Sequence, residues 1–150
     1  MLLALAVAIP LLMRARGRKA AWTENLTAAT AEVVWFARVL IPQLQQEPSA
    51  ERVAGGWRVS SARVVAAEDT FTSLETTAPD VTEAARARTL RDAVRSSRAR
   101  LDAMVQPVAA GAVSTELAAA VAELEAALAA VSQSGPAGPQ SPGGTSTGPV

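Results

Sequence analysis

The sequence predicts an all-α protein with an N-terminal membrane helix, an antiparallel three- to four-helix bundle with heptad patterning, and a disordered C-terminal tail. Three observations lead to this fold class. Residues 1–13 carry no charge and are almost all apolar. From Ala20 onward, apolar residues recur three and four positions apart, which is the period of an α-helix. From Gln133 the chain is uncharged and rich in Gly, Pro and Ser, a composition that cannot bury a core.

The first element, residues 1–19, is interpreted as an apolar membrane anchor followed by a basic collar. The collar consists of Arg14, Arg16, Arg18 and Lys19. By the positive-inside rule, cations on this side of an apolar helix keep the rest of the chain in the cytoplasm. The sequence therefore predicts a single-pass protein of the cell membrane whose bundle lies on the cytoplasmic side.

The length of the apolar stretch leaves alternatives open. Thirteen helical residues rise about 20 Å, whereas a bilayer core of about 30 Å needs about 20 residues. Either Met1 is an internal residue of a longer product, or a short insertion thins the bilayer. A cleaved signal peptide, a mitochondrial presequence and an ordinary apolar helix are the rival interpretations.

The body, residues 20–132, divides into helices predicted at about 20–46, 50–78, 79–106 and 114–132. The apolar stripe of the first comprises Trp22, Leu26, Ala29, Val33, Phe36, Leu40 and Leu44. Pro42 should bend this helix or end it early, because proline lacks a backbone donor and clashes with the preceding turn. Trp22 fits the stripe, and it also fits the interfacial position next to a membrane collar.

Ser49 is a plausible N-cap for the second helix. The stripe of this helix comprises Val53, Trp57, Ser60 or Ser61, Val64, Ala67, Phe71, Leu74 and Ala78. Gly55 and Gly56 weaken its first turns, which indicates either a frayed start or a close backbone approach to the bulky Trp35–Phe36 region of the first helix. We favour fraying, with firm helix from Trp57.

Pro79 and Asp80 mark the boundary to the third helix, where Asp80 and Glu83 resemble a capping box. The third stripe comprises Ala84, Ala87, Leu90, Val94, Ser97, Leu101, Met104 or Val105, and Val108. Ser114 is the predicted cap of the fourth helix, whose stripe comprises Leu117, Val121, Leu124, Leu128 and Val131. Short connections predict antiparallel neighbours. All aromatic residues lie on the first two helices, which should form the tightest part of the core.

The chain contains no His, Cys or Tyr. It therefore lacks a histidine base, thiolate ligands and the Glu-x-x-His motif of a di-iron bundle. Its glycines form no phosphate-binding loop. We expect a protein that is not an enzyme, with no catalytic, cofactor-binding or metal-ligating residues, and no small-molecule substrate is evident.

The third predicted helix carries the strongest pattern outside the core. Arg88, Arg91, Arg95 and Arg98 are spaced three, four and three residues apart and so line one side of the helix. They are candidate partner-binding residues for an anionic ligand or lipid surface. The plainer interpretation, which we favour, is that they flank the core and pair with Glu68, Asp69 and Glu75, and with Asp92 and Asp102.

Two functions are consistent with these features. The first is a membrane-tethered cytoplasmic helical bundle that acts as a non-catalytic interaction or scaffold module, with a protein partner or a second copy. The alternative is an extracytoplasmic or secreted helical ligand-sensing domain behind a signal peptide. Nucleic acid is disfavoured as a partner, because the body after Lys19 is mildly acidic and no aromatic residues lie between the arginines.

In composition the chain resembles small membrane-anchored helical proteins encoded in GC-rich bacterial genomes. No motif carries this resemblance, and it implies no functional residue.

Overall fold

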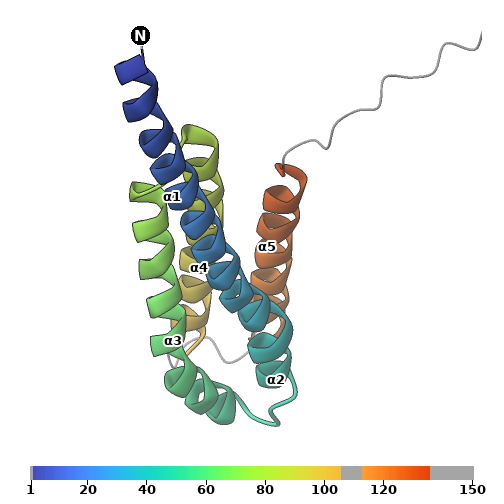
Figure 1. Cartoon of the computed structure of the whole chain (residues 1–150). Helices are drawn as coiled ribbons and strands as arrows, with labels where there is room; N and C mark the ends of the chain where they lie inside the picture. Colours follow the sequence, from blue (N-terminus) through green and yellow to red (C-terminus); the bar gives the residue numbers. More distant parts are fainter. Residues whose placement is uncertain (1, 106–112, 136–150) are drawn as a thin grey trace, which may run out of the picture.

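The structure, a computed structural model, describes residues 2–105 and 113–135, with side chains described from Arg16 onward. Within these residues it is all-helical, and its four long helices pack side by side, each antiparallel to the next along the chain (Figure 1). These helices are α1 (Leu2–Trp35), α3 (Ala50–Thr76), α4 (Val81–Met104) and α5 (Val113–Gln133). Most of the predicted tail, together with residues 106–112 before the fourth helix, lies outside the described residues.

The first helix begins at Leu2 and passes through residues 14–19 without interruption. The apolar stretch, the collar and the first bundle helix are therefore parts of one helix. Within the residues that the structure describes, no helix has an apolar run of the length that crossing a bilayer requires.

The first helix does not end at Pro42, contrary to one of the two expected outcomes. It continues through a π-helical turn, η1 (Phe36–Leu40), into a short helix, α2 (Ile41–Gln45). The Ile41 N–H donates to the Phe36 carbonyl, five residues back. A π turn is wider than an α turn, so it makes room for a proline ring that would otherwise meet the carbonyl of Arg38. The local widening carries the helix past Pro42.

The core is built from the predicted stripes. The first stripe is buried over its whole length, from Trp22 to Leu44. Phe36 and Trp57 stack with their ring centres 6.0 Å apart, and both side chains are only 2% exposed. The aromatic residues thus join the first helix to α3 at the centre of the bundle. On α5, Leu117, Leu124 and Leu128 are buried, which places this alanine-rich helix on the same core.

Two of the three predicted caps are present. The Ser49 hydroxyl accepts the Arg52 N–H at 3.3 Å, and α3 begins at the next residue, Ala50. A carboxylate oxygen of Asp80 accepts the Glu83 N–H at 2.9 Å, and α4 begins at Val81. Ser114 is not a cap, because α5 begins at Val113 and Ser114 lies inside the helix.

The expected fraying at Gly55 and Gly56 is wrong, since α3 is helical from Ala50. The alternative, a close approach to the first helix, holds at one of the two glycines. A Cβ atom built on Gly56 would lie 2.8 Å from a terminal methyl of Leu44, whereas one on Gly55 would meet nothing within 4 Å. Gly56 therefore lets the start of α3 pack closely against α2, with Leu44 as the neighbour instead of Trp35 or Phe36.

These two glycines offer a matched pair of substitutions. Gly55→Ala should raise the free energy of unfolding by up to about 1 kcal/mol, because alanine restricts the unfolded chain and the helix has room for its methyl group. Gly56→Ala should gain less, or lose stability, because Leu44 is buried and has to move. Urea unfolding followed by far-UV circular dichroism measures both; an equal gain at the two sites would contradict the close contact.

Candidate functional site

The four candidate arginines of α4 all lie beside carboxylates. Arg88 and Arg91 both contact Glu75 of α3, Arg88 through a 2.7 Å hydrogen bond. Arg95 donates to Glu68 at 2.6 Å, and Arg98 lies 3.1 Å from the other oxygen of Glu68 without hydrogen-bond geometry. The four side chains that share one side of α4 therefore line its seam with α3.

Glu68 is the most deeply buried acid of this seam. Only 7% of this residue is exposed, although its side chain ends in a carboxyl group. A buried carboxylate is costly unless cations and hydrogen bonds compensate it. Arg95 and Arg98 provide that compensation, so their first role in the structure is to hold Glu68 at the α3–α4 interface.

The α4 arginines pair with all of the acids expected from the sequence except Asp69. Arg91 also contacts Asp92 at 2.8 Å, and Arg98 lies 3.9 Å from Asp102. Asp69 is exposed and lies in none of the ion pairs found among the described residues. An external partner for the arginine stripe would have to compete with these acids, and partner binding by the stripe stays a prediction.

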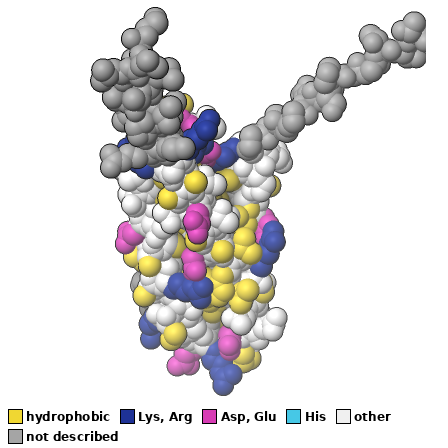
Figure 2. Space-filling view, viewed as in Figure 1, with side chains coloured by type: hydrophobic (Ala, Val, Ile, Leu, Met, Phe, Trp, Pro, Cys, Tyr) yellow, Lys and Arg dark blue, Asp and Glu magenta, His cyan; other side chains and the backbone are white. Residues whose placement is uncertain are grey.

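Opposite charges also meet elsewhere on the surface. Figure 2 shows basic side chains beside acidic ones on the visible face, with apolar surface between these charged groups. Arg63 binds Glu32 of α1 through contacts of 2.6 and 3.1 Å and lies 3.8 Å from the centre of the Trp35 ring. The hydrogen bond from Arg63 lowers the pKa of Glu32 below its ordinary value.

A second two-point contact joins the first helix to α5. Arg38 donates to both oxygens of Glu125, at 2.7 and 2.9 Å. This side-chain hydrogen bond lowers the pKa of Glu125. The exposed arginines are thus largely paired within the bundle, and these contacts join α1 to α3 and η1 to α5 at the surface.

The collar differs from the rest of the surface. Arg16, Arg18 and Lys19 are exposed. Only Lys19 has a carboxylate partner among the described residues, Asp80, at 3.4 Å. The pKa of Asp80 is lowered mainly by the backbone N–H of Glu83 and secondarily by Lys19. Arg16 and Arg18 therefore keep uncompensated positive charge at this end of the bundle.

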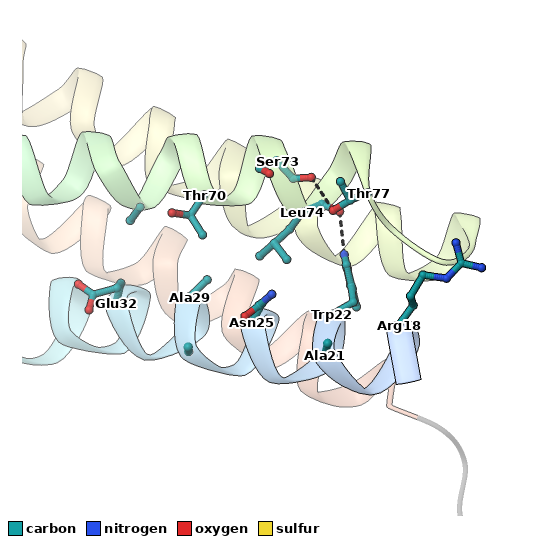
Figure 3. A pocket seen from close by; sticks show the side chains of 12 residues that line it. Arg18, Ala21, Trp22, Asn25, Ala29, Glu32, Thr70, Ser73, Leu74 and Thr77 are labelled. Atoms are coloured by element: carbon teal, nitrogen blue, oxygen red, sulfur yellow. Dashed lines mark hydrogen bonds between the residues drawn. The ribbon is translucent and has the colours of Figure 1, made fainter. Parts of the chain in front are cut away.

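Trp22 joins the part of α1 next to the collar to the end of α3, just before the turn formed by residues 77–80. Its indole N–H donates to the Leu74 carbonyl at 2.9 Å, near the end of α3 where backbone carbonyls lack helical partners (Figure 3). Trp22 is 6% exposed. It therefore belongs to the core stripe and not to an exposed interfacial position. No local pattern indicates this bond, which only the packing of α1 on α3 creates.

An open groove of about 720 Å³ runs between α1 and α3 from Arg18 towards Glu32. Small side chains form most of its walls: Ala21, Ala28, Ala29, Ala67, Thr70, Ser73 and Thr77. Asn25 and Trp22 line it from α1, and Arg18 lies at its end beside the turn after α3 (Figure 3). Sequence reasoning missed this groove. It assigned Ala29 and Ala67 to the buried stripes, and the other small wall residues lie beside those stripes, where the periodicity gives no sign of a hollow.

Within the described part of the chain, no three His, Cys, Asp or Glu side chains are grouped as metal ligands. Comparison with protein-family models, with curated proteins and with solved structures finds no match to this chain. The function of the chain is therefore inferred from the geometry and the charges of the bundle itself.

The compensation of Glu68 can be tested by removing its cations. Replacing Arg95 and Arg98 together by Gln should lower the free energy of unfolding by about 1–3 kcal/mol, because a buried carboxylate loses its partners. Arg88→Gln is the matched control and should cost about 0.5 kcal/mol or less, since Arg91 still compensates Glu75. Equal losses in urea unfolding would show that burial of Glu68 is not the deciding factor.

The lowered carboxylate pKa values predict how stability depends on pH. Glu32, Asp80 and Glu125 bind protons less readily in the folded chain than in the unfolded one. Their contribution is therefore fully present above the unfolded pKa and is lost as pH falls below about 4. Because the chain has no His, the melting temperature should stay level between about pH 6 and 8. With Glu32→Gln, the melting temperature should fall less steeply as the pH is lowered below about 4. A melting temperature that falls steeply already at about pH 6 would contradict these assignments.

Proposed function

We propose that this protein is a membrane-tethered, non-catalytic helical bundle that serves as an interaction or scaffold module on the cytoplasmic side. The apolar stretch of α1 enters the membrane as its single N-terminal span, the collar lies at the inner surface, and the bundle extends into the cytoplasm.

The observation that carries this proposal is the distribution of positive charge. The arginines of α4 are engaged with acids of the bundle, whereas Arg16 and Arg18 have no described carboxylate partner. These uncompensated cations directly follow the uncharged residues 1–13. Cations that flank an apolar helix favour the cytoplasmic side of a membrane, so the collar has both the charge and the position that the tether requires.

The continuity of α1 supports the tether over a cleaved signal peptide. Cleavage near Ala20 would cut the helix in its middle and remove Lys19, which contacts the turn before α4. It would also remove Arg18 from the end of the α1–α3 groove. The extracytoplasmic ligand-sensing alternative retains one supporting feature, the groove itself, whose volume is in the range of small-molecule sites.

Reporter fusions decide between the two orientations. With the reporter after Gln133, we expect a fluorescent protein fusion to be bright and membrane-bound, and an alkaline phosphatase fusion to be inactive. Replacing the four collar cations by Glu should move the reporters outward, whereas Arg58→Glu, a charge change of the same kind on α3, should not. Active phosphatase, or a mature N-terminus near Ala20, would overturn the proposal in favour of the alternative.

A further inference from the structure

We propose that the collar end of the bundle is a docking surface for the phosphate groups of anionic phospholipids. The collar end is defined here as Arg16, Arg18 and Lys19 of α1 together with the turn formed by residues 77–80. This surface rests on the proposed tether and deepens it: it names the lipid class and adds the α3–α4 turn to the contact surface.

Positive charge left over after internal pairing gathers at the collar end. Of the described cations, only Arg16, Arg18 and Arg58 lie beyond 4.0 Å from every described carboxylate oxygen. Two of the three are at the collar end. No acid precedes Glu24 in the chain, and among the described carboxylates Asp80 is the one that contacts a collar cation.

A cavity opens at the same end. A hollow of about 310 Å³ is lined by Arg18, Lys19, Trp22, Thr77, Ala78 and Pro79. The donors available to a phosphate are the Arg18 guanidinium and the Lys19 ammonium. The Thr77 hydroxyl is already used, since it donates to the Ser73 carbonyl at 2.8 Å. Arginine suits a phosphate because its planar fork presents two parallel N–H groups.

Side-chain contacts fix the position of the collar end next to the apolar stretch. The Trp22–Leu74 bond and the Lys19–Asp80 contact hold the collar against the α3–α4 turn. Because α1 runs into the apolar stretch without a linker, this turn faces the same side as residues 2–13. A membrane surface that meets the collar would therefore also meet Pro79 and Asp80.

The same features favour lipid over nucleic acid. The cations lie next to an uncharged apolar stretch, which suits a bilayer surface, whereas a nucleic-acid groove would be flanked by further charge or by stacking platforms. Trp22, the aromatic residue nearest the collar in the sequence, is buried and cannot stack on a base.

Vesicle flotation of the full-length protein tests the inference. Binding to vesicles of phosphatidylcholine alone measures insertion of the apolar stretch. The additional binding to vesicles that also contain phosphatidylglycerol measures the contribution of the collar end. We expect the anionic lipid to strengthen binding in a salt-sensitive way. Replacing Arg16 and Arg18 by Gln should weaken binding to the anionic vesicles about ten-fold or more. Replacing Arg58, the third unpaired arginine, by Gln should leave this binding unchanged.

Asp80→Asn adds an independent readout. Asparagine still caps α4 but removes the carboxylate that faces Lys19, so binding to anionic vesicles should rise about five-fold. Circular dichroism melting of every variant checks that the bundle remains folded. A structural role of Asp80 alone would lower stability without raising vesicle binding.

The outcomes separate the two proposals. Binding to both kinds of vesicle without a gain from phosphatidylglycerol would overturn the phosphate surface and leave the tether standing. Binding only to anionic vesicles, lost in the Arg16 and Arg18 variant, would support the surface and overturn the tether. Failure to bind either vesicle would overturn both. Competition by a short DNA duplex with the same arginine dependence would identify a general polyanion site and overturn the lipid assignment.

Discussion

The stacking of Phe36 on Trp57 is the contact around which the bundle is arranged. It joins the first helix to α3 at the centre of a core in which Trp22 and Phe71 are also buried and the remaining side chains are aliphatic or small. The first helix continues past Pro42 through the π turn at Phe36–Leu40, which begins at one of the two stacked residues. Gly56, the residue before Trp57, lets α3 approach Leu44 closely. Two irregular features of the fold thus lie next to the two stacked rings.

A second constraint, the free-energy cost of burying a carboxylate without a compensating cation, explains the arrangement of the charges. Glu68 lies at the α3–α4 seam, and Arg95 and Arg98 lie against it. A stripe of arginines that looks like a surface for a partner is therefore part of an intramolecular interface. Of the three described cations that have no carboxylate neighbour, two, Arg16 and Arg18, therefore lie at the collar.

Shape and charge together suggest how such a module works. A helix that passes from an apolar stretch into a packed bundle without a linker transmits its orientation to the bundle. The hydrogen bond from Trp22 to Leu74 of α3 and the contact of Lys19 with Asp80 in the α3–α4 turn reinforce that connection. In the proposed tether, this connection would set the direction in which the bundle stands, so that a partner would meet a defined face, such as the groove between α1 and α3.

The helical class, the apolar stripes and the caps at Ser49 and Asp80 could be predicted from the sequence, because helical periodicity and capping are local properties of the chain. It also indicated the pairing of α4 arginines with Glu68 and Glu75, since charges beside a core stripe usually meet those of the next helix. Only the tertiary structure decided the path through Pro42, the close contact at Gly56, the Trp22–Leu74 bond and the groove. Each of these depends on how two helices that are distant in sequence approach one another, and on the room left between them, which no local pattern records.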